Sequence, residues 1–166
     1  MLIRLAKIAL VAAAALFLLI VVFNNLTDYD SNYQFVRHVL SMDTTFTGNK
    51  CLWRALPGPT IHHAFYASII LWEFVSGTVL AAGAWKLWRA RHAPAAEWRL
   101  AKSLAIAGLT LSLLQWFVAF LTVGGEWFLM WQSPSWNGQE AAFRMFATMG
   151  LMLLFLNQAD DDRPAA

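Results

Sequence analysis

The residues with the clearest chemical potential lie on one long apolar segment, 59–89, which carries a single acid, Glu73. His62 precedes Glu73 by eleven residues, close to three helical turns, and Tyr66 lies four residues after His62. In a helix, these three side chains share one face. Such a line of histidine, tyrosine and carboxyl groups could pass protons or bind a cation inside a membrane.

Glu73 also has a purely structural interpretation. Gln115 is the one strongly polar residue inside another apolar segment, 98–123. Polar side chains that meet across two helices hold membrane bundles together, and Glu73 with Gln115 would be such a pair. The sequence leaves both the functional and the structural interpretation of Glu73 open.

A second set of polar and aromatic side chains gathers in the stretches 24–60 and 124–138 and at the start of the last apolar segment. Carboxylates and amides beside aromatic rings could hold a lipid headgroup, a quinone or a small polar ligand. Loops at a membrane surface are also ordinarily polar and aromatic. The candidate ligand-binding residues in this set are Asp28, His38, Asp43, Glu126, Trp131, Gln132, Asn137 and Arg144.

Metal and haem sites have little support in the sequence. Haem held between two histidines needs one on each of two facing helices. His62 and His63 are adjacent and point apart by about 100° in a helix, which leaves His38 as a partner. Cys51 is the single cysteine, so an intrachain disulfide and a thiolate cluster are excluded. We predict no metal site, assign no cofactor, and retain a haem- or quinone-binding redox module as an alternative.

The composition indicates that membrane helices position these residues. Of 166 residues, 59% are hydrophobic and 13% charged, whereas soluble domains carry roughly 25% charged residues. Four apolar runs reach the ~20 residues that cross a bilayer. We therefore predict a single all-α membrane domain over 1–166, a polytopic four-helix bundle. Its spans are expected at 5–23, 61–87, 98–123 and 139–156.

Shorter signals refine this bundle. Ser31 and Gln34 have capping-box spacing, and apolar residues then recur at helical spacing, which predicts a short amphipathic helix over 32–42 at the membrane surface. The pair Gly124 and Gly125 is expected to end the third span. Small residues allow close helix contact. Three glycines are the expected contact points: Gly77, Gly83 and Gly108.

The basic residues predict the orientation. Eight fall on the side of the termini and the loop 88–97, and four fall on the side of the segments 24–60 and 124–138. An excess of basic residues marks the cytoplasmic face, so both termini are expected in the cytoplasm. The first group comprises Arg4, Lys7, Lys86, Arg89, Arg91, Arg99, Lys102 and Arg163. The second comprises Arg37, Lys50, Arg54 and Arg144. The acidic residues 160–162 form a tail too short to predict a role.

The sequence contains no phosphate-binding glycine loop, no HExxH and no nucleophile elbow, so we expect no enzyme. Its net charge of +2, without a basic stripe, also predicts no nucleic-acid partner.

Several motifs resemble a bacterial family of predicted small integral membrane proteins. They are the stretches 24–29, 35–46, 124–128, 130–133, 136–139 and 141–144, and the likeness covers nearly the whole chain. That family is a domain of unknown function with four predicted spans. The resemblance implies four spans and a bacterial inner-membrane location, and it transfers no activity, cofactor or catalytic residue.

Small size, little soluble domain and no catalytic motif favour an accessory or assembly subunit of a larger membrane complex. Its expected partners are the lipid bilayer and other membrane-protein subunits. The alternative is a protein that binds or transports a small molecule, lipid or ion through Glu73 and the outer polar-aromatic residues.

Overall fold

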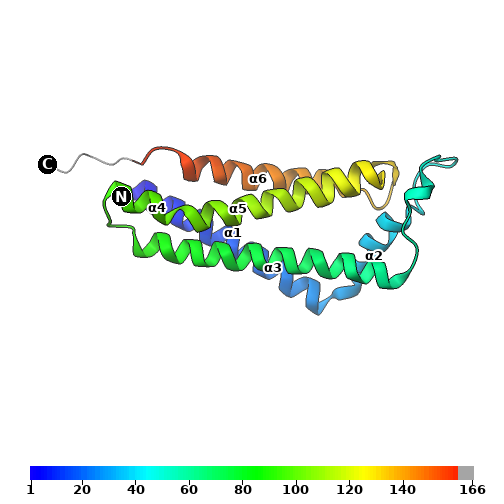
Figure 1. The fold of residues 1–166 in the computed structure, drawn as a ribbon, viewed down its shortest axis with the longest axis horizontal. Coiled ribbons are helices and arrows are strands. Elements are labelled where there is room, and N and C mark those ends of the chain that lie inside the picture. Colours follow the sequence, from blue (N-terminus) through cyan, green and yellow to red (C-terminus); the bar gives the residue numbers. More distant parts are fainter. Residues whose placement is uncertain (161–166) are drawn as a thin grey trace.

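Long helices packed lengthwise dominate the computed structural model, which describes residues 1–160 (Figure 1). Within this range the chain forms helices and loops and no strand, which confirms the predicted all-α bundle. The acids Asp161 and Asp162 and the basic Arg163 of the expected tail lie outside the described residues. The elements are α1 (Leu2–Thr27), α2 (Tyr29–Ser41), η1 (Leu52–Arg54), α3 (Pro59–Arg89), α4 (Ala95–Ala101), α5 (Ser103–Leu114), η2 (Gln115–Trp127), η3 (Met130–Gln132) and α6 (Gln139–Asn157).

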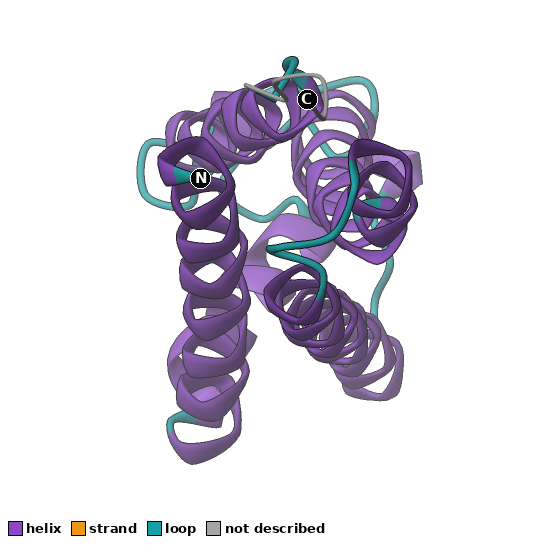
Figure 2. Cartoon of the chain, turned by 90° about the vertical axis from the view of Figure 1, so that its left-hand side faces the viewer, coloured by secondary structure: helices purple, strands orange, loops and turns teal. Residues whose placement is uncertain are grey.

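Four helical stretches are long and apolar enough to cross a membrane: α1, α3, the continuous stretch Ala95–Trp127, and α6. Met1 and the end of α6 lie at one end of the bundle, which we call the terminal end (Figure 1). The segments 28–58 and 128–138 lie at the other end, the loop end. Viewed from the terminal end, α1 runs more obliquely than the other long helices (Figure 2).

The third apolar segment is not one regular helix. α4 and α5 meet at Lys102, and from Gln115 to Trp127 the chain is a π-helix, η2. The Phe128 N–H donates to the Val123 carbonyl at 3.0 Å, the five-residue spacing of that helix type. Gly124 and Gly125, which were expected to end this segment, lie within η2. Neither has a positive φ, so neither supplies the left-handed turn that ends a helix.

The three glycines predicted as contact points do lie where helices touch. A Cβ on Gly77 would lie 3.1 Å from the Leu19 side chain of α1, and a Cβ on Gly83 would lie 2.7 Å from the Ala105 backbone nitrogen of α5. A Cβ on Gly108 would lie 2.6 Å from Leu80. Close backbone approach without side-chain bulk is how membrane helices pack.

The amphipathic helix α2 begins at Tyr29, earlier than the residue 32 predicted, and ends at Ser41. Val36, Val39 and Leu40 form its buried face. α2 lies at the loop end and is inclined to the long helices (Figure 1). Its buried face joins a cluster that includes Tyr66 and Met130, whereas the cluster nearer the terminal end is built around Leu18, Leu80 and Trp98. Glu73 lies on α3 between these two clusters in the sequence.

Candidate functional site

Glu73 is the centre of a buried polar network. Its side chain is on α3 and the residue is 2% exposed. The Asn25 side-chain amide, near the end of α1, donates to Oε2 of Glu73 at 2.8 Å. The Asn32 amide, on α2, donates to Oδ1 of Asn25 at 2.7 Å. The carboxyl group thus joins α3 to α1, and the Asn25 side chain joins both to α2.

Tyr66 extends the network toward the loop end. It precedes Glu73 by seven residues, two helical turns, so the two side chains share a face of α3 as predicted. The Tyr66 hydroxyl donates to the Asn25 carbonyl oxygen at 3.4 Å, and the residue is 1% exposed. Tyr66, Glu73, Asn25 and Asn32 line a cavity of about 230 Å³, which we call the polar chamber.

Gln115 is fully buried at the first position of η2. Its side chain approaches the Glu73 carboxyl, but neither Nε2 nor Oε1 of Gln115 has a partner with hydrogen-bond geometry among residues 1–160. A buried amide without partners costs about 1–3 kcal/mol. The predicted Glu73–Gln115 proximity is present, and it leaves hydrogen-bonding capacity unused.

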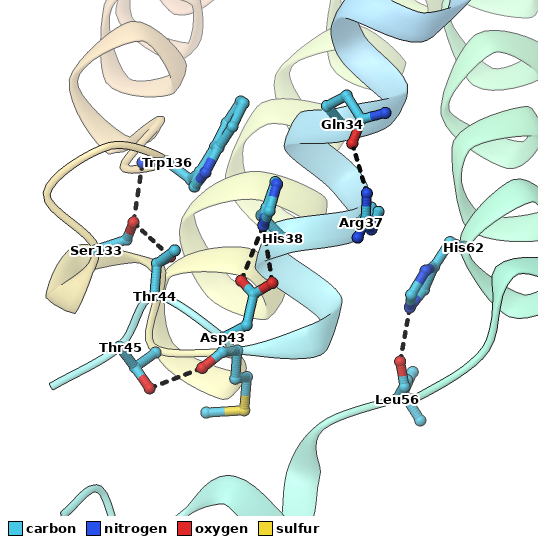
Figure 3. Close-up of polar contacts among 11 residues, drawn as sticks. Gln34, Arg37, His38, Asp43, Thr44, Thr45, Leu56, His62, Ser133 and Trp136 are labelled. Carbon is cyan, nitrogen blue, oxygen red and sulfur yellow. Dashed lines mark hydrogen bonds and ion pairs between the residues drawn. The ribbon is translucent and has the colours of Figure 1, made fainter. Parts of the chain in front are cut away.

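The two adjacent histidines have different roles. Nε2 of His62 lies 2.7 Å from the Leu56 carbonyl oxygen, so His62 anchors the segment before α3 (Figure 3). His63 turns to α2 instead, where its Nδ1 is 2.8 Å from the Tyr29 hydroxyl and its ring stacks on Tyr33 at 4.2 Å. Burial raises the pKa of Tyr29, and Tyr33 beside it raises it further.

Tyr29 connects this histidine to the buried network, because its ring centroid lies 4.6 Å from that of Tyr66. An aromatic chain thus leads from exposed His63 through Tyr29 to Tyr66 and the Asn25–Glu73 pair. Of the histidine pair, His63 contacts this line of aromatic rings, whereas helical spacing pointed to His62.

The predicted outer residues divide into separate local contacts. His38 lies 2.9 Å from an Asp43 carboxylate oxygen, and its ring stacks on Trp136 at 4.6 Å (Figure 3). Gln132 accepts hydrogen bonds from the Phe46 N–H and the Asn49 amide. These contacts hold the loop 42–51 against 128–138.

The other outer residues also make local contacts or point outward. Asp28 accepts from the Ser31 hydroxyl at 2.7 Å, and Trp131 meets Phe46 edge-on. Oδ1 of Asn137 accepts from the Gln139 N–H at 3.1 Å. Glu126 and Arg144 are exposed, and the structure shows no ion pair for either within its described residues. None of the eight outer residues lines the polar chamber.

A second cavity, of about 220 Å³, adjoins the polar chamber, and we call it the apolar chamber. It lies between α2, α3 and η2, and the two cavities share Phe35, Val36, Ile69 and Phe120. Six residues of η2 line one or both chambers: Trp116, Val118, Ala119, Phe120, Val123 and Gly124. π-Helices occur frequently at functional sites.

Sequence reasoning missed Asn25 and Asn32 as members of the site. The signal for Asn25 was present, because it continues the stripe Val11, Ala14, Leu18, Val22 at helical spacing, and that stripe is the buried face of α1. The signal for Asn32 was weaker, since it lies in a polar stretch and only the packing of α2 brings it to Asn25.

A separate charged cluster closes the terminal end. Nζ of Lys7 lies 2.8 Å from Oδ1 of Asp160 and donates to the Gln158 carbonyl at 2.6 Å, and Nζ of Lys102 lies 2.5 Å from Oδ2. Burial acts to raise the pKa of Asp160, but the hydrogen bonds from Lys102 and Lys7 outweigh it and hold the pKa below its ordinary value. Asp160, in a tail expected to be too short to matter much, joins α1 and the junction of α4 and α5 to the segment that follows α6.

No group of three His, Cys, Asp or Glu side chains in residues 1–160 is arranged to hold a metal ion. A ring nitrogen of His38 and one of His62 each contact a protein oxygen, of Asp43 and Leu56 respectively.

A family model described as "Predicted small integral membrane protein (DUF2165)" matches residues 3–159. No curated protein and no solved structure matches the chain.

Proposed function

We propose that this chain, which belongs to the DUF2165 family of predicted small integral membrane proteins, binds a small ligand at Glu73. The supporting observation is that the Glu73 carboxyl lies beside a cavity of about 230 Å³ and not only against another helix. An ionisable side chain within a membrane helix is costly and usually has a function.

A purely structural role for Glu73 explains less of the geometry. The Asn25–Glu73 hydrogen bond does join α1 to α3. A structural pair, however, needs no adjoining space, whereas the Glu73 carboxyl lines a cavity together with Tyr66 and Asn32. A polar group bound at Glu73 would use this adjoining space.

The packing favours binding over transport. Toward the terminal end, α3 continues from Glu73 to Leu80 and Leu87, and both are 0% exposed in the apolar core together with Leu18. A polar ligand would have to cross this packed cluster to leave by that end. The chambers therefore resemble a pocket entered from the loop end or from the bilayer.

The test compares small molecules that stay with the purified protein. Wild type, Glu73→Gln and Glu126→Gln would be extracted gently from native membranes, and their organic extracts compared by mass spectrometry. Glu126 is the matched control because it is exposed and lines neither chamber. We expect a molecule at about one per chain in wild type and Glu126→Gln, and its loss in folded Glu73→Gln. Equal content in all three proteins, including none in any, would overturn the proposal.

A role as accessory or assembly subunit is the second candidate, and one surface favours it. Aromatic side chains crowd the loop end with large exposed areas: Trp53 is 72% exposed, Phe46 59% and Trp127 48%. The Arg54 guanidinium packs over the rings of Trp53 and Trp127. Exposed aromatic residues with arginine are enriched where proteins bind one another.

Native mass spectrometry on the tagged protein tests this candidate. A stoichiometric partner protein that is lost in Trp53→Ala, and retained when lipid-exposed Leu71 is changed to Ala, supports it. Isolation from native membranes as a chain without any other protein would contradict it.

We further propose that the protein resides in the bacterial inner membrane with both termini in the cytoplasm. The distribution of basic residues supports this orientation. Arg4, Lys86 and Lys102 belong to the terminal end, whereas Arg37 and Arg54 belong to the loop end. Cysteine labelling in intact cells, at Asn49→Cys and at Ala96→Cys in a Cys51→Ser background, should modify only the first. Labelling of Ala96→Cys alone would reverse the orientation.

A further inference from the structure

The two chambers adjoin, with Phe35, Val36, Ile69 and Phe120 in the walls of both, and their remaining walls differ in polarity. Glu73, Asn25, Asn32 and Tyr66 supply polar groups to the polar chamber, whereas Ser68 is the one hydroxyl-bearing residue lining the apolar chamber. The Ser68 hydroxyl already donates to the Phe65 carbonyl at 2.7 Å. A molecule whose head lies at Glu73 therefore has apolar surroundings directly beside it.

The apolar chamber reaches the outer surface of the bundle, where the bilayer lies. Phe65 of α3 and Val118 of η2 line it, and they are 38% and 39% exposed. Deeper in, Trp72 is fixed by its indole N–H, which donates to the Leu111 carbonyl at 3.0 Å. Because its mouth opens between two membrane helices, a hydrocarbon chain could enter from the lipid without crossing water.

The charge of the residues that line the chambers limits which head group such a molecule can carry. Glu73 is the one charged residue lining either chamber, and neither contains a lysine, an arginine or a histidine from the described part of the chain. An anionic head would face a carboxyl group without any compensating cation. A head with N–H or O–H donors would find acceptors in Glu73 and in the Asn25 and Asn32 amides.

We propose that the ligand is an amphiphile with one apolar chain in the apolar chamber and a small head at Glu73, where the head donates hydrogen bonds and carries no negative charge. This inference rests on the function proposed above and specifies the ligand class of the same site. Long-chain amines and prenylated or alkylated hydroquinones both have this chemistry.

The test uses four defined probes on the full chain in phosphatidylcholine nanodiscs, without oxygen, with binding measured by native mass spectrometry. They are dodecylamine, decylhydroquinone, dodecanoate and butylamine. We expect dodecylamine, decylhydroquinone or both to bind at one per chain and at least tenfold more tightly than dodecanoate. Whether dodecylamine or decylhydroquinone binds shows whether the head group is an amine or a hydroquinone. Butylamine should bind at least tenfold more weakly than dodecylamine, or not at all.

A pair of variants at neighbouring positions of α3 distinguishes binding in the apolar chamber from non-specific binding at the lipid-facing surface. Ser68→Phe places a ring in the apolar chamber and should weaken binding of the long-chain probe at least tenfold. Ala67→Phe adds the same ring at the preceding residue, which is exposed and lines neither chamber, and should leave binding unchanged. Equal effects of the two variants would show adventitious lipid binding only and would overturn the inference.

The outcomes also distinguish this inference from the proposed function. If butylamine binds as tightly as dodecylamine and both need Glu73, the placement of a hydrocarbon chain in the apolar chamber is wrong and the proposed function stands. If dodecanoate binds as tightly as the amine, the assignment of the head is wrong. If none of the probes binds while an extracted small molecule still depends on Glu73, the ligand class is wrong. If no probe binds and no molecule depends on Glu73, both proposals fail.

Discussion

Asn25 donates a hydrogen bond of 2.8 Å to the Glu73 carboxyl and so joins two membrane-length helices through side chains 48 residues apart. The same Asn25 accepts from Asn32 through Oδ1 and from Tyr66 through its backbone carbonyl. Asn25 is therefore the residue through which α1, α2 and α3 meet.

Replacing Asn25 by alanine should lower stability. The Glu73 carboxyl would lose its donor and Asn32 its acceptor, and hydrogen bonds between membrane helices contribute about 1 kcal/mol each. We expect Asn25→Ala to reduce the free energy of unfolding by about 1–2 kcal/mol. Unfolding in detergent, followed by circular dichroism, measures it. Asn24→Ala is the control, because Asn24 is exposed, and equal stability of the two variants would contradict the role of Asn25.

Gly83 should tolerate no side chain. A Cβ there would lie 2.7 Å from the Ala105 nitrogen, an atom of the α5 backbone that cannot move alone. Overpacking of this kind costs about 1–3 kcal/mol, so Gly83→Ala should lower the melting temperature in detergent. Gly150→Ala is the matched change, because its Cβ would meet only Leu113 at 3.6 Å. If Gly83→Ala melts no lower than Gly150→Ala, the close contact between α3 and α5 is wrong.

Hydropathy and helical spacing were sufficient to predict the four-span bundle and to bring together Tyr66 and Glu73 of the polar chamber. Four apolar runs of membrane length predicted the long helices, and the seven-residue spacing of Tyr66 and Glu73 placed both on one buried face. Spacing within one helix says nothing about rotation relative to its neighbours. For that reason Asn25 and Asn32 were not recognised as the partners of Glu73.

The π-helix η2 and the Asp160 cluster could not be predicted from the sequence, for different reasons. Local sequence does not distinguish five-residue from four-residue hydrogen bonding, and Gly124 and Gly125 pointed to a helix end instead. Asp160 lies in a polar tail, and its pairing with Lys7 joins residues 153 positions apart. An even number of spans places both termini at one end, but it does not select which side chains pair.

The Asp160 cluster should stabilise the protein in a pH-dependent manner. The pKa of Asp160 is held below its ordinary value, so the contribution is present above the ordinary carboxyl range and is lost as the pH falls through the folded-state pKa. Asp160→Asn should therefore lower stability at pH 7 by roughly 2 kcal/mol, and the difference from wild type should shrink below about pH 4. Melting temperatures across pH 3–8 would test this.

Glu97→Gln is the control for this effect, because Glu97 is an exposed acid of the same end of the bundle. It should leave the melting profile unchanged at every pH. A constant difference between Asp160→Asn and wild type from pH 3 to 8 would contradict the ionic role of Asp160.

Amide hydrogen exchange should distinguish the roles of His62 and His63. His62 lies 2.7 Å from the Leu56 carbonyl, and the Leu56 N–H donates to the Leu40 carbonyl at 2.9 Å, so His62 holds the segment 55–58 against the end of α2. His62→Ala should speed exchange of the Leu56 amide several-fold, because local opening no longer breaks the contact with His62. His63→Ala should leave that amide unchanged, since His63 contacts Tyr29 and Tyr33 instead. Faster exchange at Leu56 in His63→Ala, with none in His62→Ala, would contradict the assignment of His62 as the residue that holds this segment.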